Sequence, residues 1–549
     1  ADTVYAATSG KIIKSVNGGV TWTTVYTETY LEVHEMSFKI NDPKILLAAS
    51  DQGLLRTVNS GASWTKVFTQ QSWAVKFKIG NPSVAYAIRK NGSGSDFMKS
   101  TNGGASFTAS NTGWWTPGTG ETVTGAHLAV CPSNATKLYA YLCGEGSNLA
   151  GYIGVFVSNN DGTSWANTHP TGAVGNSPTL YAVPSHTNLM ASDGLTGLQQ
   201  GFYDMAIIVN PLNDQQLIAG GTSWYKSTDG GATWTGLGGY QSGLAWSHPD
   251  IQAIAVLGSD LWIASDGGLN YSTNFGGSIV ARMKGISGSD MWGFDSGWNE
   301  DVLVGGRYHN GNMGWHQSFP GGQFYRLGGA EDPTGYVNPG ENKKTYFSDI
   351  GGKIIKSGFG NGVDNFPMGM SPNQSYAYYA NSEMTWDPRC WNIVYIGKDN
   401  GIWKSIDGGA SYTLLYAFPG TADKKVFEVE VCRSNPDVIY CSQWDGVDDA
   451  IWKTTNGGTT WTQLTPLPLP NNNDRVKLAA SATDPNVLWA AVTYGDNGKK
   501  VYKTTNGGTT WTNLTTSLLD NITVTDIMAQ HGTDGGVYIG CKGAVFYRN

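Results

Sequence analysis

Short apolar runs alternate with turn residues along the whole chain. Ile207, Ile208 and Val209 run into Asn210-Pro211, and similar runs of β-branched and aromatic residues recur between clusters of Gly, Asn, Asp and Thr. Runs of this length bounded by turn residues are typical of strands. No apolar run approaches the roughly 20 residues needed to span a bilayer. The pattern therefore predicts an all-β protein without a membrane span.

One eight-residue motif divides this pattern into units of similar length. It first appears as Ser15-Val-Asn17-Gly18-Gly19-Val-Thr21-Trp22. Clear copies follow at residues 57–64, 100–107, 158–165, 227–234, 405–412, 454–461 and 504–511, with degenerate copies near Ser272 and Ser357. Neighbouring copies are mostly about 42 to 50 residues apart, which is the length of a four-stranded propeller blade.

The residue types of the motif predict a tight turn between two strands. Asn or Asp can bond back to the backbone, and Gly supplies a positive φ. The Ser or Thr hydroxyl can close the same turn, and the terminal ring is expected to pack between adjacent blades. One blade then consists of a strand, an Asn-Pro or Asp-Pro turn, a second strand, a turn, a third strand, the motif and a fourth strand.

The motif resembles the Asp-box (BNR) repeat of sialidases, sortilin-type domains and two-propeller xyloglucanases. The resemblance implies a multi-bladed β-propeller, with the motif in outer turns that serve the structure. About eleven blade-sized units and a last partial one fit the chain. We expect two propellers, residues 1–330 and 331–549, with the boundary in the irregular stretch near 328–345. A single large sortilin-like ring is the alternative, and C-terminal and N-terminal strands are candidates to complete one blade together.

Residues 201–357 have a narrower resemblance. Tyr203-Asp204, His248-Pro-Asp250-Ile-Gln252, Ser265-Asp266-Gly267-Gly268 and residues 305–311 follow in an order similar to that of large secreted Bacteroidota proteins, many exported as type IX cargo. Such proteins are often described as glycosyl hydrolase-like. Where their pattern has a second His, this chain has Gln252, and Tyr308-His309 replaces Gln-Asp. The resemblance implies an altered site.

Composition and charge narrow the class of protein. The chain has 74 Gly and 21 Trp, only 14% charged residues and a formal net charge of −8, so it is not a disordered protein. No basic stripe is present, which argues against a nucleic-acid partner. Cys131 with Cys143, and Cys432 with Cys441, flank expected hairpins and are candidates for cross-hairpin disulfides. We interpret the start at Ala1 as the end left by signal-peptide removal, which indicates a secreted or cell-surface protein.

Paired carboxyl groups are the first candidate catalytic residues. No Arg-Ile-Pro sequence is present, so the chain lacks a hallmark of active sialidases. A xyloglucanase needs an acid and a base facing each other across a cleft. Ser348-Asp349-Ile-Gly-Gly resembles one half of that arrangement, and Asp445 beside Trp444 is its possible partner. An Asp before Gly-Gly is more often a turn residue, and this interpretation is favoured.

A lyase-like cluster is the second candidate. His248, Asp250, Arg307, Tyr308 and His309 supply the base and the carboxylate-neutralising group that cleavage of a uronate polymer requires. Neighbouring strand residues face opposite sides, so Tyr308 and His309 enter one pocket only at a bulge. A polar network that supports blade packing is the favoured alternative.

Aromatic loops and an acidic segment complete the candidates. Exposed rings in loops are platforms for sugar faces, with local packing as the alternative. The candidate ligand-binding residues are Trp114, Trp115, Trp246, Trp292, Trp298 and Trp315. No cofactor is predicted, although residues 445–449 (Asp-Gly-Val-Asp-Asp) offer oxygen ligands for calcium. This segment lacks the full calcium-loop spacing, so a solvated turn is the default interpretation.

Three functions remain open at this point. The first is a secreted or cell-surface propeller that recognises carbohydrate or a surface partner. The second is a polysaccharide-degrading lyase or glycoside hydrolase, and the third is a scaffold subunit of a cell-surface assembly. The first is preferred because no complete catalytic constellation is visible in the sequence.

Overall fold

The computed structural model covers the chain from Ala1 to Asn549. The structure describes residues 2–146, 151–169, 187–195, 199–241, 247–282, 291–297, 302–307, 311–329, 334–340, 344–372, 381–420, 424–444, 449–468, 475–493, 500–519, 522–533, 535–541 and 544–548.

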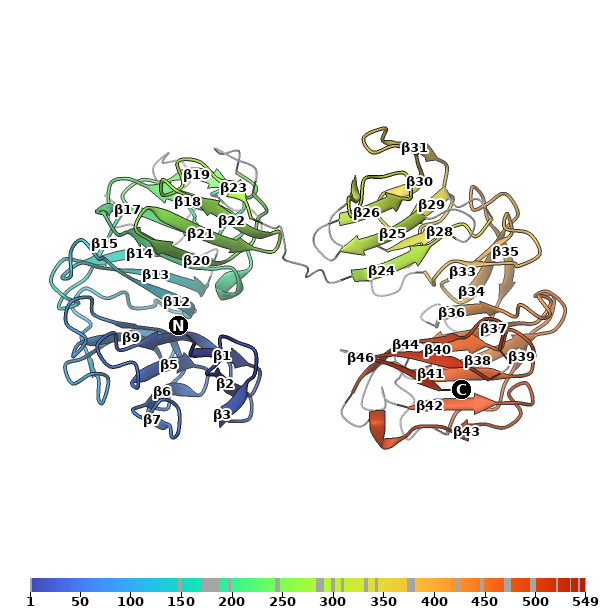
Figure 1. The fold of residues 1–549 in the computed structure, drawn as a ribbon, viewed down its shortest axis with the longest axis horizontal. Coiled ribbons are helices and arrows are strands. Elements are labelled where there is room, and N and C mark those ends of the chain that lie inside the picture. The colour runs from blue at the N-terminus through green and yellow to red at the C-terminus, as the bar shows by residue number, and fades with distance from the viewer. Residues whose placement is uncertain are drawn as a thin grey trace. The chain divides into compact units, whose positions relative to one another are not determined.

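Strands make up almost all of the regular structure. Within the described ranges, strands β1 to β46 form twelve antiparallel sheets, ten of four strands and two of three, and the only helical elements are two 3-10 turns, η1 (Gly201–Tyr203) and η2 (Ser517–Leu519). The chain divides into two compact units, residues 1–286 (unit 1) and 287–549 (unit 2), both drawn in Figure 1. No described helix is long and apolar enough to cross a membrane. The prediction of an all-β, multi-bladed protein is confirmed.

Unit 1 contains one three-stranded and five four-stranded sheets. They are β1 Val4–Thr8, β2 Lys11–Ser15, β3 Thr23–Thr27; β4 Val33–Phe38, β5 Leu46–Ser50, β6 Gly53–Thr57, β7 Thr65–Phe68; β8 Ser72–Phe77, β9 Ala85–Asn91, β10 Gly94–Ser100, β11 Thr108–Ala109; β12 Thr122–Val130, β13 Leu138–Glu145, β14 Gly151–Ser158, β15 Ala166–Asn167; β16 Ala206–Asn210, β17 Asn213–Gly220, β18 Trp224–Ser227, β19 Thr235–Gly238; β20 Ile251–Leu257, β21 Asp260–Ser265, β22 Gly268–Ser272 and β23 Val280–Ala281.

Unit 2 has five four-stranded sheets followed by one of three strands. They are β24 Met291–Ser296, β25 Val302–Arg307, β26 Gly311–His316, β27 Tyr325–Gly328; β28 Gly335–Val337, β29 Lys344–Phe347, β30 Gly351–Ile355, β31 Val363–Phe366; β32 Thr385–Trp386, β33 Val394–Lys398, β34 Gly401–Ser405, β35 Thr413–Ala417; β36 Lys425–Val431, β37 Ile439–Trp444, β38 Asp449–Thr454, β39 Thr462–Gln463; β40 Val476–Ala480, β41 Leu488–Val492, β42 Val501–Thr504, β43 Thr512–Asn513; β44 Val524–Ala529, β45 Val537–Cys541 and β46 Ala544–Arg548.

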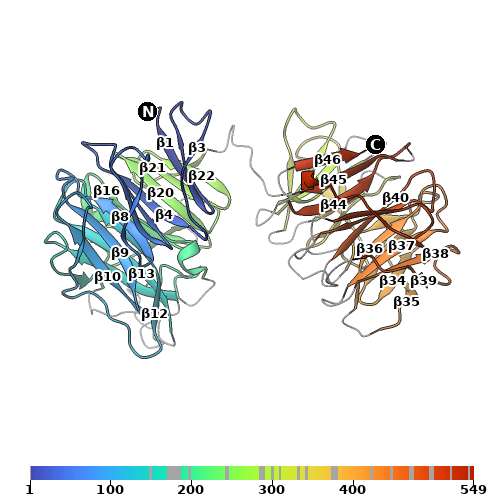
Figure 2. The same ribbon diagram turned by 90° about the horizontal axis from the view of Figure 1, so that it is seen from below.

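The first strands of successive sheets line the inside of each unit. In unit 1, β4, β8, β12, β16 and β20 contact one another in that order, and in unit 2 β36 contacts both β32 and β40, which in turn contacts β44. Figure 2 shows the sheets of each unit fanned in succession. Apolar side chains fill the space between neighbouring sheets, as Tyr86 and Leu142 do between β8–β11 and β12–β15. This is blade packing around an axis.

The repeated motif folds into one recurring turn between the third and fourth strands. Asn17 N and Gly19 N donate to Ser15 Oγ at 3.3 and 2.8 Å, and Thr21 N donates to Asn17 Oδ1 at 2.9 Å. Gly18 and Gly19 have φ of 70° and 95°, which only Gly adopts readily. The side chains therefore satisfy the backbone groups of the turn.

The same bond, from the N–H of the Gly at the fifth position to the hydroxyl at the first, recurs in nine described turns. Their first residues are Ser15, Thr57, Ser100, Ser158, Ser227, Ser272, Ser405, Thr454 and Thr504. The degenerate copy at Ser272 is thus a full turn, whereas at Ser357 the carbonyl oxygen accepts from Asn361 Nδ2. The terminal ring is buried at Trp165 and Trp461, as expected, but Trp22 is 41% exposed.

The boundary between the two units differs from the one expected from the sequence, and so does the state of the cysteines. The expected boundary at 330 falls inside unit 2, and the N-terminal and C-terminal strands belong to separate three-stranded sheets. All six cysteines are free. In the first hairpin Cys143 lies opposite Gly125, while Cys131 follows the Val130–Leu138 pair at the other end, so the strand register separates the two sulfurs. The same displacement separates Cys432 from Cys441, which lies opposite Val429.

Removing the hydroxyl of one repeated turn tests its contribution to stability. Ser100→Ala leaves the buried Gly104 N–H without its acceptor, so we expect the free energy of unfolding to fall by about 1–3 kcal/mol. Thr101→Ala, an exposed change in the same turn, should alter it by less than about 0.5 kcal/mol. Urea unfolding measures both, and equal effects of the two changes would contradict this role of the hydroxyl.

Candidate functional site

The inner edges of the first strands carry backbone N–H groups that no strand pairs. Side chains from the preceding sheet accept several of these N–H groups. Glu35 Oε2 on β4 accepts from Val75 N at 2.8 Å, and Ser37 Oγ accepts from Phe77 N at 3.2 Å. An unsatisfied buried N–H is costly, so polar side chains are required where apolar ones would otherwise pack.

Unit 2 uses carboxyl side chains in the same way. Asp295 Oδ2 on β24 accepts from Val337 N at 2.8 Å, and Glu430 Oε1 on β36 accepts from Ala480 N at 3.1 Å. Each bond joins the first strands of two sheets. Because these strands surround the axis, their carboxyl groups gather there.

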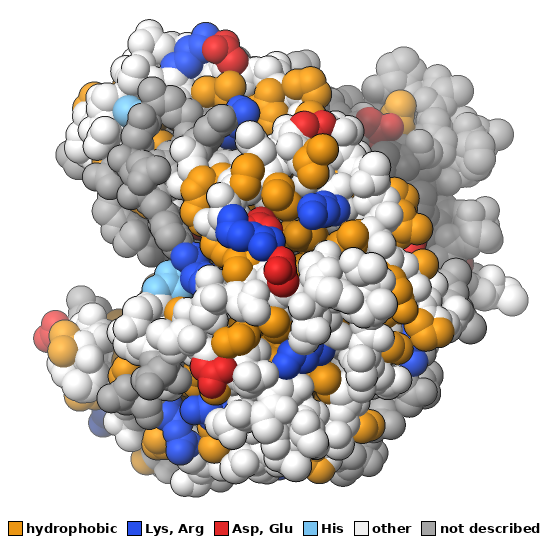
Figure 3. Space-filling model, turned by 90° about the vertical axis from the view of Figure 1, so that its right-hand side faces the viewer, with side chains coloured by type: hydrophobic (Ala, Val, Ile, Leu, Met, Phe, Trp, Pro, Cys, Tyr) orange, Lys and Arg blue, Asp and Glu red, His pale blue; other side chains and the backbone are white. Residues whose placement is uncertain are grey.

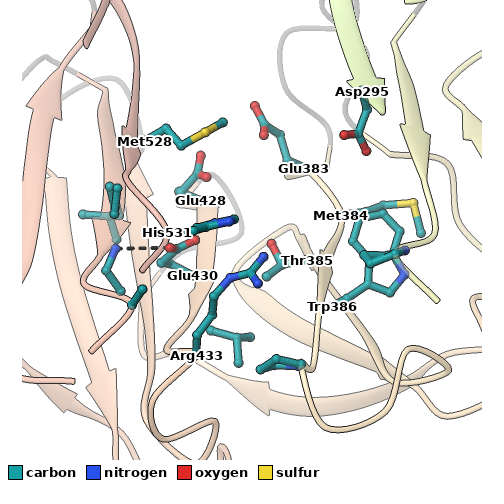
Figure 4. Close-up of a pocket in the computed structure, with 18 of the residues that line it drawn as sticks. Asp295, Glu383, Met384, Thr385, Trp386, Glu428, Glu430, Arg433, Met528 and His531 are labelled. Carbon is teal, nitrogen blue, oxygen red and sulfur yellow. Dashed lines mark hydrogen bonds between the residues drawn. The ribbon is translucent and has the colours of Figure 1, made fainter. Parts of the chain in front are cut away.

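A cavity of about 400 Å³ lies at this position in unit 2. We call it the axial pocket. Its wall is built from the first strands β24, β28, β32, β36, β40 and β44 and from residues at their ends. Figure 4 shows Asp295, Glu383 and Glu428 arranged around a common space. A concave site of this size with a few converging polar groups is typical of ligand binding.

Five carboxyl groups belong to the lining of the pocket. They are Asp295, Glu383, Glu428, Glu430 and Asp526. Lys477 on β40 forms ion pairs with Glu383 and, at 3.0 Å, with Glu428. Burial alone would lower the pKa of Lys477, but these neighbouring carboxylates outweigh burial and raise it well above its ordinary value. Lys477 therefore stays charged and neutralises part of the acidic wall.

Two of the carboxyl groups titrate near neutrality. Desolvation raises the pKa of Glu430 to about 7, against the hydrogen bond from Ala480 N. Desolvation likewise raises the pKa of Asp295 to about 6, although two backbone N–H groups stabilise its ionised form. Raised carboxyl pKa values in a concave site are a marker of function. At pH 7 Glu430 is half protonated and can give or accept a proton.

The lining of the pocket also includes aromatic, thioether and cationic groups. They belong to Trp386, Met528, Arg433 and His531, and Figure 4 labels each of them. Desolvation, and secondarily the charge of Arg433, lowers the pKa of His531. Indole faces stack on sugar rings, and guanidinium groups donate to hydroxyl oxygens. The pocket thus offers the contacts that a sugar requires.

A second set of carboxyl side chains lies in unit 1 and consists of Asp204, Asp250 and Asp266. Gln252 Nε2 donates to Asp204 Oδ1 at 2.6 Å and to Asp266 Oδ1 at 3.1 Å, and Gln200 Nε2 donates to Asp250 Oδ1 at 3.0 Å. We call these residues the Asp204 cluster. Burial, and then the charges of Asp250 and Asp266, raise the pKa of Asp204 to about 8. Asp204 therefore retains its proton at neutral pH.

The Asp204 cluster joins three of the segments that the sequence singled out. Asp250 is 3% exposed and has φ of 66°, an uncommon value for a residue other than Gly. His248 packs on the backbone of Gly267, where a Cβ would meet the His248 Cβ at 2.2 Å. The structure thus brings Asp250 and His248 to one end of β20, and Asp250 is a buried network residue.

Of the other residues of the predicted lyase cluster, the structure describes Arg307, which belongs to unit 2. Arg307 ends β25 in unit 2 and is half-buried, and Tyr308 and His309 lie outside the described residues. Desolvation, and then the charge of Arg326, lowers the pKa of Arg307. Asp349 lies in the exposed turn between β29 and β30, where Asn312 Nδ2 donates to its Oδ1 at 2.6 Å. Asp349 is thus a turn residue, as the favoured interpretation had it.

The loop tryptophans correct the predicted aromatic platform. Trp114 is 7% exposed, donates to Ser95 Oγ at 3.1 Å and packs edge-on against Trp165, so it is a core residue. Trp115 and Trp315 are half-buried against the cores of their units. Trp246, Trp298 and the Trp292 side chain lie outside the described residues. Among the described residues, Tyr203 lies beside the Asp204 cluster and is 67% exposed.

The predicted calcium segment is not described over residues 445–448. In the described part of the chain, no group of three or more His, Cys, Asp or Glu side chains is arranged to hold a metal ion.

Figure 3 shows one face of the molecule, on which acidic and basic side chains are interspersed with neutral and apolar ones.

The axial pocket was not predicted from the sequence, although one signal for it is present there. The strand from Lys425 to Val431 alternates acidic and apolar residues, with Glu428 and Glu430 in an otherwise apolar context. Alternation with period two places both carboxyls on one face of the strand. An inner strand with an acidic face predicts an acidic axis.

The comparisons with known proteins bear on the fold. No protein-family model matches the chain, and no curated protein matches it either. Among solved structures it is similar to the GH74 xyloglucanase from Xanthomonas campestris, with 15% identity, a TM-score of 0.55 and coverage of 100% of this chain and 89% of that one. It is also similar to an ancestral GH74 enzyme, with 14% identity, a TM-score of 0.57 and coverage of 100% and 91%. At these identities the likeness establishes the β-propeller fold alone.

The Asp204 cluster predicts an unusual dependence of stability on pH. A pKa of about 8 in the folded state and an ordinary value of 3.8 in the unfolded state mean that the folded state binds the extra proton between these values. Stability therefore falls as pH rises from about 4 to 8. Asp204→Asn, which keeps a donor and removes the titration, should flatten this fall. Urea midpoints at pH 5 and pH 8 measure it.

The exposed change Asp2→Asn is the control and should leave the slope of stability against pH as in the unchanged protein. A slope that Asp204→Asn does not alter would contradict a protonated Asp204.

Proposed function

We propose that the protein is an extracellular glycan-binding propeller and that the axial pocket of unit 2 holds the sugar. The observation that carries the proposal is the combination, in one cavity of about 400 Å³, of Trp386, Arg433 and several carboxyl groups. Carboxylates and guanidinium groups bond to sugar hydroxyls, while an aromatic face packs on the apolar face of the ring.

Further observations agree with an extracellular glycan ligand. The xyloglucanase with the similar fold is by its description a carbohydrate-active protein. The order of motifs in residues 201–357 resembles that of exported Bacteroidota proteins, which supports an extracellular location and export as type IX cargo. The formal charge of −8 is compatible with a glycan partner, because a neutral sugar is not repelled by negative charge.

Hydrolysis of the bound glycan is a second candidate function. The observation that favours it is the pair Glu430 and Asp295, whose pKa values of about 7 and 6 let one carboxyl group be protonated while the other is ionised. A general acid and a base or nucleophile are what glycoside hydrolysis requires. In this hypothesis Glu430 protonates the leaving oxygen, and Asp295 acts on the anomeric carbon or on water.

If the glycan binds in the axial pocket, substitution of an arginine in the pocket lining should lower the affinity for it. Arg433→Ala removes donors to the sugar, so we expect affinity for the best-binding glycan of a neutral and uronate-rich panel to fall about ten-fold. Arg548→Ala, an exposed arginine on β46 outside the pocket, is the matched control and should bind as the unchanged protein does. Glycan arrays and calorimetry measure the effect.

Equal affinities of the two arginine variants would place binding elsewhere. Absence of binding to every glycan would contradict the proposal and leave a protein partner as the leading alternative.

If the protein hydrolyses the glycan, new reducing ends should form without the absorbance at 235 nm that an elimination product would give. Glu430→Gln keeps the acceptor for Ala480 N but cannot donate a proton as a carboxylic acid, so the rate should fall by at least about 100-fold. Absorbance at 235 nm would indicate elimination instead. Binding without any product leaves recognition as the function.

A further inference from the structure

The lining of the axial pocket holds more acidic than basic side chains, and desolvation raises the pKa of four of its five acids, Asp295, Glu428, Glu430 and Asp526. Among the described residues of its wall, five are carboxylic acids and Arg433 is the only lysine or arginine. Lys477, behind the wall, is engaged by Glu383 and Glu428. Glu430 and Asp295 accept backbone N–H groups, which bring no net charge. A positively charged ligand would therefore gain favourable Coulomb energy inside the pocket.

The lining of the pocket fits an organic cation better than a metal ion. Trp386 and Met384 lie beside each other on one side of the space, and Glu428 and Met528 lie on the other (Figure 4). An indole face attracts ammonium groups, and the apolar wall suits a carbon skeleton. A cavity of about 400 Å³ is far larger than a bare ion, and the described residues include no metal-binding group.

We propose that the axial pocket selects a glycan bearing a protonated amine, an amino sugar, whose ammonium group binds among Asp295, Glu430 and Glu428. This proposal rests on glycan binding as the proposed function and specifies the class of ligand. The ammonium group favours the ionised forms of the acids that it faces and pairs with them, while Trp386 packs on the sugar ring.

Binding of the amine should release protons from the pocket. Glu430 faces Arg433, Glu383 and Lys477, and Asp295 faces Glu383. Tyr336 on β28 faces the same acids, and burial raises its pKa well above 10, so it stays neutral. With pKa values of about 7 and 6, Glu430 and Asp295 hold part of a proton at neutral pH. An ammonium group beside them favours their ionised forms and expels that proton.

Calorimetry of the full chain with a glucosamine tetramer and its fully N-acetylated counterpart tests the proposal. The two probes share the ring and differ in charge. At pH 7 we expect the amine form to bind at least ten-fold more tightly. Titrations in two buffers of different ionisation enthalpy should reveal a pH-dependent change in bound protons for the amine form only, because the protons lost by the pocket acids go to buffer or to unprotonated amine. At pH 5 its affinity should fall at least ten-fold, although acid makes the amine more positive, because Glu430 and Asp295 become protonated.

Matched glutamine variants place the effect in the pocket. Glu430→Gln should remove most of the preference for the amine. Glu35→Gln, at a glutamate of unit 1 that accepts a backbone N–H in the same way, should keep it. The pair also controls for non-specific attraction to an acidic protein. Circular dichroism checks that both variants fold.

Each other result has a definite meaning. Equal affinities for the two probes would overturn the amine preference but leave glycan binding intact. Binding of neither probe, with other glycans of the panel bound, would overturn the amine preference alone. No binding to any glycan would overturn both proposals. A preference that Glu430→Gln retains would show that the amine binds outside the axial pocket and would overturn the assignment.

Discussion

The inner edge of each first strand must find partners for its backbone groups away from bulk water. A four-stranded blade pairs its first strand on one side only, and the other edge faces the axis. Glu35, Asp295 and Glu430 each accept an N–H from the first strand of the following sheet, and Thr385 Oγ1 donates to the Val429 carbonyl at 2.7 Å. These bonds link neighbouring blades where apolar packing ends.

The same requirement accounts for the chemistry of the interior. Carboxyl groups brought inward as acceptors are partly desolvated, which raises their pKa values at Asp295 and Glu430. Lys477 offsets only part of their charge. In unit 1 the buried Asp204 accepts a hydrogen bond from Gln252. Among the described residues no lysine neutralises it there, and burial raises its pKa so that it keeps its proton. Structural acceptors thus become groups that titrate near pH 7.

The sequence predicted the fold well because the repeated turn is local. Ser15, Asn17 and Gly19 make all their defining bonds within seven residues, so the motif can be recognised without knowing what surrounds it. Trp114 shows the opposite case. Its loop is rich in Thr and Gly, which suggested exposure, but the chain returns and places the ring against Trp165, fifty-one residues later. The axial pocket was missed for the same reason, because Asp295 and Glu430 meet only when the blades assemble around an axis.

The claim on which this account depends is that the axis holds a carboxyl group half protonated at neutral pH. Selective labelling of glutamate with carbon-13 at the side-chain carboxyl allows a direct titration by NMR, with Glu430→Gln assigning the signal. The account predicts that the Glu430 resonance shifts with a midpoint of about 7. A midpoint near the ordinary value of 4.5 would mean that the carboxylate is well solvated and would contradict the account.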